Sequence, residues 1–280
     1  MHGKLTFMTL ALAFVFGIFG LIVGSFLNVV ILRYGTGGGL GGRSACMSCG
    51  MQLRFYHLIP VFSWIALRGR CAGCGTRISI QYPLVEAVTA ITFALVGSTL
   101  LPLLPQLLAL AAFCFLIALS AYDLKHTIIP DQWSYAFAAL ALAFSVAAMM
   151  PHGVGEWGIL IASGPAVAFP IWALWFVSKG RAMGFGDVKL AVGIGWLLGP
   201  YWGIVALFGG FIIGAVISVC ILLPLPYLRR MFALHRFSLG EHSLGFTMKS
   251  EVPFGPFLAC SCFIIWYAHF ALALAPLALY

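Results

Sequence analysis

The 280 residues are 62% hydrophobic and only 8% charged, and the formal net charge is +8. A soluble globular domain is about a quarter charged, so this composition excludes that class and indicates an integral membrane protein. Lysines and arginines at a cytoplasmic membrane face account for the positive charge, which gives no support for a nucleic-acid partner.

Uncharged runs of the length that crosses a bilayer, about 20 residues, recur along the chain. Pro102 and Pro105 interrupt one long run and Pro200 interrupts another, and proline ends helices more readily than it continues them. The pattern predicts an all-α polytopic membrane protein with about eight transmembrane helices. Their expected positions are 5–32, 83–101, 106–122, 132–150, 157–178, 188–199, 203–228 and 254–274.

The orientation follows from the basic residues, which favour the cytoplasmic side. Threading eight helices with the N-terminus outside places every lysine and arginine except Lys4 on that side. The first apolar run is too long for the core of a signal peptide, and no clear small-residue cleavage site follows it, so we expect a retained first helix.

Two of the seven acidic residues stand at predicted helix ends. Asp123 closes the third helix in "SAYDLKHTIIPD" and Asp187 opens the sixth in "GFGDVKL", so both are expected at one depth near the cytoplasmic boundary. Two facing carboxylates can share a proton, so that one activates water while the other donates to a scissile carbonyl. Gly184 and Gly186 lack a Cβ atom and would let a substrate backbone approach closely.

Other readings of these charges remain open. Asp123 and Asp187 are also compatible with interfacial residues that cap helices or pair with Lys125 and Lys189. An ion or metal transporter would use the two aspartates as a relay, but the threading places no acids near the bilayer centre on several helices. Asp131 precedes an apolar run and is expected as a helix N-cap, and Lys189 is expected as an anchor at the lipid interface.

A second constellation lies in the first cytoplasmic loop. Two C-x2-C pairs are separated by twenty-one residues, and they comprise Cys46, Cys49, Cys71 and Cys74. Four thiolates in this pattern resemble a zinc ribbon that holds one tetrahedral Zn²⁺, and Gly50 and Gly75 suit its tight turns. Two disulfides are the alternative, although cytoplasmic thiols stay reduced. The other four cysteines lie inside predicted helices and are expected to pack as small apolar residues.

The motifs together resemble one family. "GFGDVKL" and "YDLKHTIIPD" are similar to the paired signature of the type IV prepilin peptidases, bacterial membrane aspartyl proteases with a Gly-X-Gly-Asp motif. "GLIVGSFLNVVILR", the four-cysteine loop, "IPVFSWIALRGRC" and "YPLVEA" follow in the family's order, so the resemblance covers nearly the whole chain. It implies that Asp123 and Asp187 are the catalytic pair.

The resemblance also implies a second activity. Such peptidases commonly methylate the new N-terminal amine with S-adenosylmethionine, and a glycine of the "RGRC" segment that matches Gly69 is linked to methyl transfer. The chain departs from the commonest pattern just upstream, where "FYHLIP" replaces an Asp-Asn pair before Ile-Pro. A peptidase without methylation, whose zinc loop is purely structural, is therefore the main alternative.

These expectations define one function. The resemblance implies a bacterial inner-membrane endopeptidase that cuts type IV prepilins and pseudopilins at the cytoplasmic face, with membrane lipids as further partners. The expected division is a first transmembrane helix at 1–32, a cytoplasmic four-cysteine loop at 33–81 and a seven-helix peptidase core at 82–280.

Overall fold

The computed structural model describes residues 2–36, 39, 41–99, 101–149, 153–222 and 253–274. Within these ranges the regular structure is helical, with two isolated bridges and no strand, so the expected all-α class is confirmed. The elements in chain order are α1 (His2–Arg33), η1 (Phe55–Leu58), α2 (Phe62–Ala66), α3 (Gln81–Gly97), α4 (Leu103–His126), α5 (Asp131–Met149), α6 (Val154–Ser178), α7 (Phe185–Ile217), η2 (Ser218–Leu222) and α9 (Gly255–Leu274).

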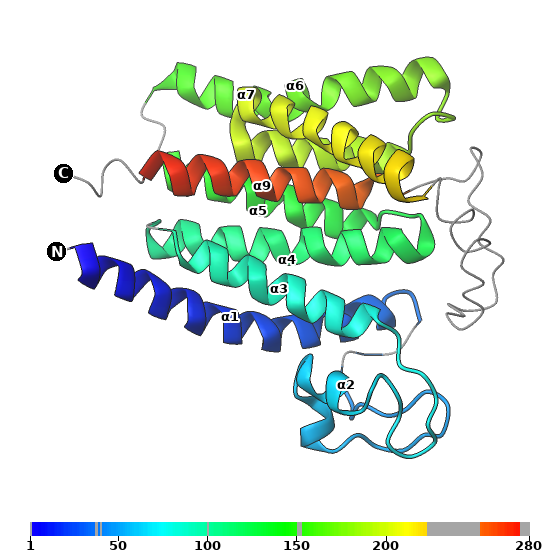
Figure 1. The fold of residues 1–280 in the computed structure, drawn as a ribbon. Helices are drawn as coiled ribbons and strands as arrows, with labels where there is room; N and C mark the ends of the chain where they lie inside the picture. The colour runs from blue at the N-terminus through cyan, green and yellow to red at the C-terminus, as the bar shows by residue number, and fades with distance from the viewer. Residues whose placement is uncertain are drawn as a thin grey trace.

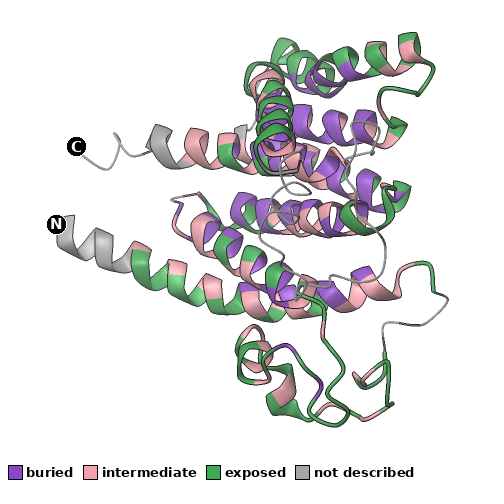
Figure 2. Ribbon diagram, turned by 45° about the vertical axis from the view of Figure 1, so that its right-hand side comes forward, coloured by how far each residue is buried: buried purple, intermediate pink, exposed green. Residues whose placement is uncertain are grey.

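The long helices lie side by side, and the start of α1 and the end of α9 both lie on the left in Figure 1. The four-cysteine segment projects beyond the C-terminal half of α1, beside the two short helices η1 and α2. Buried residues gather on α4, α5 and α7, whereas much of α1 and α6 is exposed (Figure 2). The exposed faces carry many large apolar side chains, as a lipid-facing surface does.

Close packing between α1 and α3 depends on two glycines one helical turn apart. A Cβ atom on Gly20 would lie 2.8 Å from Ala90 Cα, and one on Gly24 would lie 2.8 Å from Glu86 Cα. Small residues at this spacing let two membrane helices approach to backbone distance. The contact fixes the first turns of α3 against the C-terminal half of α1, next to the four-cysteine segment.

The predicted sixth and seventh helices form one bent element, α7. Gly199, next to Pro200, takes a non-helical conformation with φ 75° and ψ 178°. Beyond this bend a Cβ atom on Gly203 would lie only 3.3 Å from Gly195 Cα, and both residues contact Val167. Eight residues of straight helix span about 12 Å, so the two halves of α7 fold against each other. The break predicted from the sequence is present, but as a sharp bend without a loop.

The expected count of eight spans is not confirmed. Among the described residues, four helical segments are long and apolar enough to cross a membrane by length and composition: Thr9–Arg33, Leu103–His126, Val154–Ser178 and Phe185–Cys220. The apolar helices Gln81–Gly97 and Gly255–Phe270 are shorter. The chain is thus a multi-pass membrane protein, and the part of the seventh predicted helix after residue 222 lies outside the described residues.

Candidate active site and cysteine cluster

Asp123 lies in the last turn of α4, where its carboxylate is held by another helix. Thr127 ends α4 in a left-handed conformation, with φ 53°, and its N–H donates to the Asp123 carbonyl. Because a helix C-terminus carries partial negative charge, a carboxylate there needs stabilisation from elsewhere. The backbone N–H of Gly255, the first residue of α9, donates to Asp123 Oδ2 at 3.1 Å. The positive end of α9 therefore stabilises a side chain that is only 5% exposed.

Asp187 lies in the first turn of α7, three residues after the N-cap Gly184. Its carboxylate thus lies at the positive end of α7, next to the backbone of Gly184. The side chain is 7% exposed, and its Oδ1 is buried without a hydrogen-bond partner among the described residues. An unsatisfied carboxylate oxygen is costly in a buried place and marks a position with a role in chemistry.

The two aspartates lie in one neighbourhood, because the side chain of Ile129 contacts both Gly186, which precedes Asp187, and Gly255, which contacts Asp123. Their role as a catalytic pair stays a prediction. A Cβ atom on Gly255 would lie 2.7 Å from Asp123 Oδ2, so the start of α9 touches this carboxylate. Two close carboxylates of like charge favour a state in which they share one proton. Two carboxylates in this arrangement can supply a proton donor and a proton acceptor at the ends of two helices.

Ile129 and Gly255 complete this site and escape sequence reasoning. Ile129 belongs to the connection between α4 and α5, and its side chain lies against both Gly186 and Gly255. The only sequence signal for Gly255 is the Gly-Pro pair in "FGPF", since proline is common in the first turn of a helix. Nothing in the sequence shows that this helix start meets a residue 132 positions away.

The two glycines of the motif have different surroundings. A Cβ atom on Gly186 would lie 2.8 Å from Ile129 Cβ, so packing against Ile129 requires a glycine there. A Cβ atom on Gly184 would meet Asp187 Oδ2 at 3.7 Å, which is an ordinary contact. Close approach of a substrate backbone thus stays a prediction for Gly184. At Gly186 the packing against Ile129 by itself explains why the residue is a glycine.

Lys189 forms an ion pair with Asp131 and reaches neither aspartate of the pair. Its Nζ lies 2.5 Å from Asp131 Oδ1 and within 5.5 Å of the ring centroids of Tyr135 and Phe185. Asp131 is the first residue of α5, so the bond joins the starts of α5 and α7. The alternative in which Lys189 neutralises Asp187 is not what the structure shows.

The four cysteines of the loop form one cluster. Their Sγ atoms all lie within 4.8 Å of one another, and Cys46 and Cys74 are 3.8 Å apart. Sulfurs about 2.3 Å from a central zinc at tetrahedral angles lie about 3.8 Å apart, so the donor set fits Zn²⁺. None of the eight cysteines is in a disulfide, and the arrangement is therefore not the two bridges of the alternative reading.

The two C-x2-C pairs have the same backbone structure. The N–H of Cys46 donates to Met51 O and that of Gly50 to Cys46 O. In the second pair, the N–H of Cys71 donates to Thr76 O and that of Gly75 donates to Cys71 O. Gly50 and Gly75 have φ of 70° and 71°, values that side chains disfavour, so the expected role of these glycines in tight turns is confirmed. Hydrogen bonding to Thr76 lowers the pKa of Cys74 to about 6, whereas hydrogen bonding to Cys46 and Cys74 raises the pKa of Cys49 to about 11, so the four thiols influence one another's ionisation.

Gly69 lies between the second cysteine pair and the short helix α2. Its φ is 66°, and a Cβ atom there would lie 2.8 Å from Cζ2 of the Trp64 indole. Gly69 N–H donates to Trp64 O at 2.9 Å, and Ile78 N–H donates to Gly69 O at 2.8 Å. The residue therefore supports an aromatic side chain, and the structure places it on a different element from the aspartate pair.

Comparison with known proteins identifies the family. The model of the Bacterial Peptidase A24 N-terminal domain matches residues 18–100, and that of the Type IV leader peptidase family matches residues 110–219. No solved structure matches the chain. Family models thus match both the N-terminal part of the chain, with the cysteine cluster, and the following part, with the two aspartates.

Curated relatives agree with the family models. The Prepilin leader peptidase/N-methyltransferase of Aeromonas salmonicida is 30% identical over 278 residues, which cover 88% of this chain and 87% of the relative. The protein of that name from Myxococcus xanthus is 36% identical over 222 residues, covering 74% and 62%. The Type 4 prepilin-like proteins leader peptide-processing enzyme of Escherichia coli is 34% identical over 205 residues, covering 65% and 75%. The chain belongs to the type IV leader peptidase family.

Proposed function

We propose that this protein removes the leader of type IV prepilins and pseudopilins as an aspartyl endopeptidase, with Asp123 and Asp187 as its catalytic pair. The observation that carries the proposal is that two buried carboxylates at helix ends lie in one neighbourhood, and that one of them keeps an oxygen with no partner among the described residues. Family membership supplies the substrate class, because the relatives are named for prepilin processing.

The chemistry needs one shared proton. The ionised carboxylate of the pair accepts a proton from water as the water oxygen attacks the scissile carbonyl carbon. The protonated carboxyl donates its proton to the carbonyl oxygen. Collapse of the tetrahedral intermediate breaks the C–N bond. The leaving amine takes the proton that the first carboxylate received from water, and the other carboxylate takes back the proton on the carbonyl oxygen, so the pair again holds one proton. Because close carboxylates titrate as a unit, the roles belong to the pair.

The position of the pair suits a substrate that remains in the membrane. Asp123 ends α4 and Asp187 begins α7, and the sequence threading places both ends at the cytoplasmic face of a bacterial inner membrane. A prepilin carries a short basic leader followed by an apolar helix. The apolar helix would stay among lipids while the leader reaches the polar end of the bundle. The peptidase core then corresponds to residues 82–280, and 33–81 is the cytoplasmic loop.

We also propose N-methylation of the new terminus, with S-adenosylmethionine as the methyl donor. When bound, this group would supply a methyl for the amine nitrogen, which loses a proton. The relatives' names include this activity. Zinc, held by Cys46, Cys49, Cys71 and Cys74, would cross-link the loop that carries Gly69. The tetrahedral spacing of the four sulfurs supports this role.

Mass spectrometry of the product tests both activities at once. Purified full-length protein in lipid is incubated with a prepilin, with and without S-adenosylmethionine. Cleavage in both samples and a mass gain of one methyl group only with the cofactor are expected. An uncut prepilin would refute the peptidase proposal. A cut product that never gains a methyl group would refute the methylation proposal and support the alternative of a peptidase without methyltransferase activity.

A further inference from the structure

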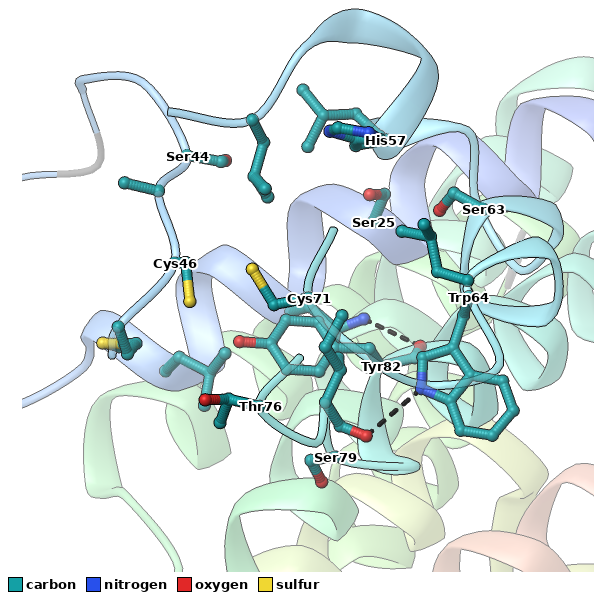
Figure 3. A pocket seen from close by; sticks show the side chains of 18 of the residues that line it. Ser25, Ser44, Cys46, His57, Ser63, Trp64, Cys71, Thr76, Ser79 and Tyr82 are labelled. Carbon is teal, nitrogen blue, oxygen red and sulfur yellow. Dashed lines mark hydrogen bonds between the residues drawn. The ribbon is translucent and has the colours of Figure 1, made fainter. Parts of the chain in front are cut away.

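A cavity of about 400 Å³ lies between α1, the four-cysteine segment and α3. This volume falls in the range of small-molecule sites, about 300–1,000 Å³. In Figure 3 Cys46 and Cys71 line one side of the cavity, Trp64 lies on the opposite side, and His57 and Tyr82 lie between these sides. The aspartate pair is not among its lining residues.

Two polar atoms in the cavity wall have no partner. The Asn28 side-chain nitrogen donates to Tyr82 O at 3.0 Å, a dashed line in Figure 3. Because a carbonyl oxygen only accepts, this bond leaves Asn28 Oδ1 turned away from it, buried and unpaired. His57 Nδ1 is likewise buried without a partner among the described residues. Buried polar groups normally have hydrogen bonds, so both atoms point to a ligand that supplies them.

A strained turn borders the same cavity. Val61 has φ 60° and ψ −52°, and Phe62 N–H donates to Pro60 O, which together define a rare γ-turn. The Val61 N–H donates to Glu86 Oε2 at 2.7 Å. Glu86, on α3, is only 7% exposed and lines the cavity. A β-branched residue keeps such a conformation only where its surroundings impose it, and such strain gathers at functional sites.

The aromatic wall is fixed by a closed set of bonds. The Trp64 indole N–H donates to Ile78 O at 3.3 Å, Ile78 N–H donates to Gly69 O, and Gly69 N–H donates to Trp64 O. The Gly69 backbone lies directly against the indole ring. Any side chain at position 69 would displace Trp64, so Gly69 acts on the cavity through this ring and is itself no lining residue.

We propose that this cavity is the S-adenosylmethionine site of the protein. Asn28 and His57 would bind polar groups of the cofactor, Trp64 would pack against its adenine ring, and the Glu86 carboxylate would face its positive charge. The inference rests on the proposed methylation. It changes the expected role of Gly69, which becomes a positioning residue for Trp64 rather than a contact of the cofactor or the new amine.

Photo-cross-linking locates the cofactor directly. Full-length protein in lipid is irradiated with methyl-tritiated S-adenosylmethionine, digested, and mapped by mass spectrometry. Label on the peptides that carry Trp64 or Tyr82, competed by S-adenosylhomocysteine, is the expected result. Label confined to peptides of α5, α6, α7 or α9 would overturn the site while leaving methylation intact. A wild-type protein that neither binds nor methylates would overturn both proposals.

Binding measurements on variants add a matched control. Asn28→Leu and His57→Phe each remove one unpaired polar atom and should weaken S-adenosylmethionine binding about tenfold or more by equilibrium dialysis. Gln106→Leu removes a buried amide that donates to Val96 O, near the other end of α3, and should leave binding unchanged. Equal affinity in wild type, Asn28→Leu and His57→Phe would place the cofactor elsewhere.

Gly69 requires a readout that separates positioning from folding. In Gly69→Trp the KM for S-adenosylmethionine should rise at least about tenfold, or methylation should be lost, because the indole of Trp64 is displaced. Cleavage kinetics should match those of wild type, since both aspartates lie on other helices, and the product should be lighter by one methyl group. Loss of cleavage together with methylation would make Gly69 a general structural residue and refute its action through Trp64.

Discussion

The aspartate pair and the cysteine segment are held in place by different forces. Asp123 accepts a hydrogen bond from Gly255 at the start of α9, Asp187 lies in the first turn of α7, and packed apolar helices fix these ends. The cysteine segment has two short helices and two tight turns, and of its four cysteines two are exposed, one is half-buried and one is buried. A segment with so little apolar burial is expected to depend on a cross-link, which the proposed zinc would provide. The two sites should therefore fail independently.

The largest effect is expected at the aspartates. Asp123→Asn and Asp187→Asn should each abolish prepilin cleavage, by a factor of about 10³ or more, because an amide neither accepts the proton of water nor shares one. Both proteins should still insert and fold, since an amide fits the same space and leaves the helices intact. Cleavage is followed by gel shift of a prepilin, and near-normal cleavage by either variant would remove that residue from the mechanism.

Metal removal should act on the other region. We expect one zinc per chain by elemental analysis under reducing conditions, and serine at any two of the four cysteines should abolish stoichiometric binding. Structural zinc contributes folding free energy of about 10 kcal/mol or more in small domains, so methylation should be lost and proteolysis between α1 and α3 should become fast. If metal-free protein kept an intact, protease-resistant loop, the cysteine segment would not depend on a metal, and the proposed difference from the aspartate pair would be wrong.

A smaller loss is expected where α9 meets Asp123. In Gly255→Ala the added methyl group would lie 2.7 Å from Asp123 Oδ2, so the carboxylate must move. Misplacement of a catalytic group by about 1 Å can cost about 10²-fold, and we expect a drop in kcat of this order. Gly158→Ala, on α6, is the control, because its methyl group would meet nothing within 4 Å. Equal losses in the two variants would argue against a specific role for α9.

The sequence predicts the helices well and the contacts between them poorly. Long apolar runs place most helix ends within a few residues of the observed ones, because burial of backbone bonds in lipid leaves few alternatives. Asp123 and Asp187 could be expected near one face because each stands at a helix end, whereas their role as a catalytic pair stays a prediction. Gly255, Ile129 and the cavity could not, since each depends on segments that meet only in three dimensions. The bend at Gly199 was visible as a glycine and proline, but its sharpness was not.

The ion pair between Lys189 and Asp131 should have the smallest effect, although it lies two residues from Asp187. Asp131 is exposed, and an exposed pair contributes about 0–1 kcal/mol, so Lys189→Met, which keeps the apolar stem, should lower the melting temperature by a few degrees at most.

Cleavage by Lys189→Met should stay within about threefold of wild type, because the N-termini of α9 and α7 stabilise the two aspartates without this lysine. Asp131→Asn, which removes the other partner, should behave alike, and the double variant should equal either single one if the pair acts as a unit. A loss of cleavage above about tenfold in Lys189→Met alone would instead show that the ammonium group assists the aspartates. The aspartate pair would then depend on a nearby side-chain charge as well as on helix packing. Its difference from the cysteine segment, which is expected to depend on a cross-link, would be smaller.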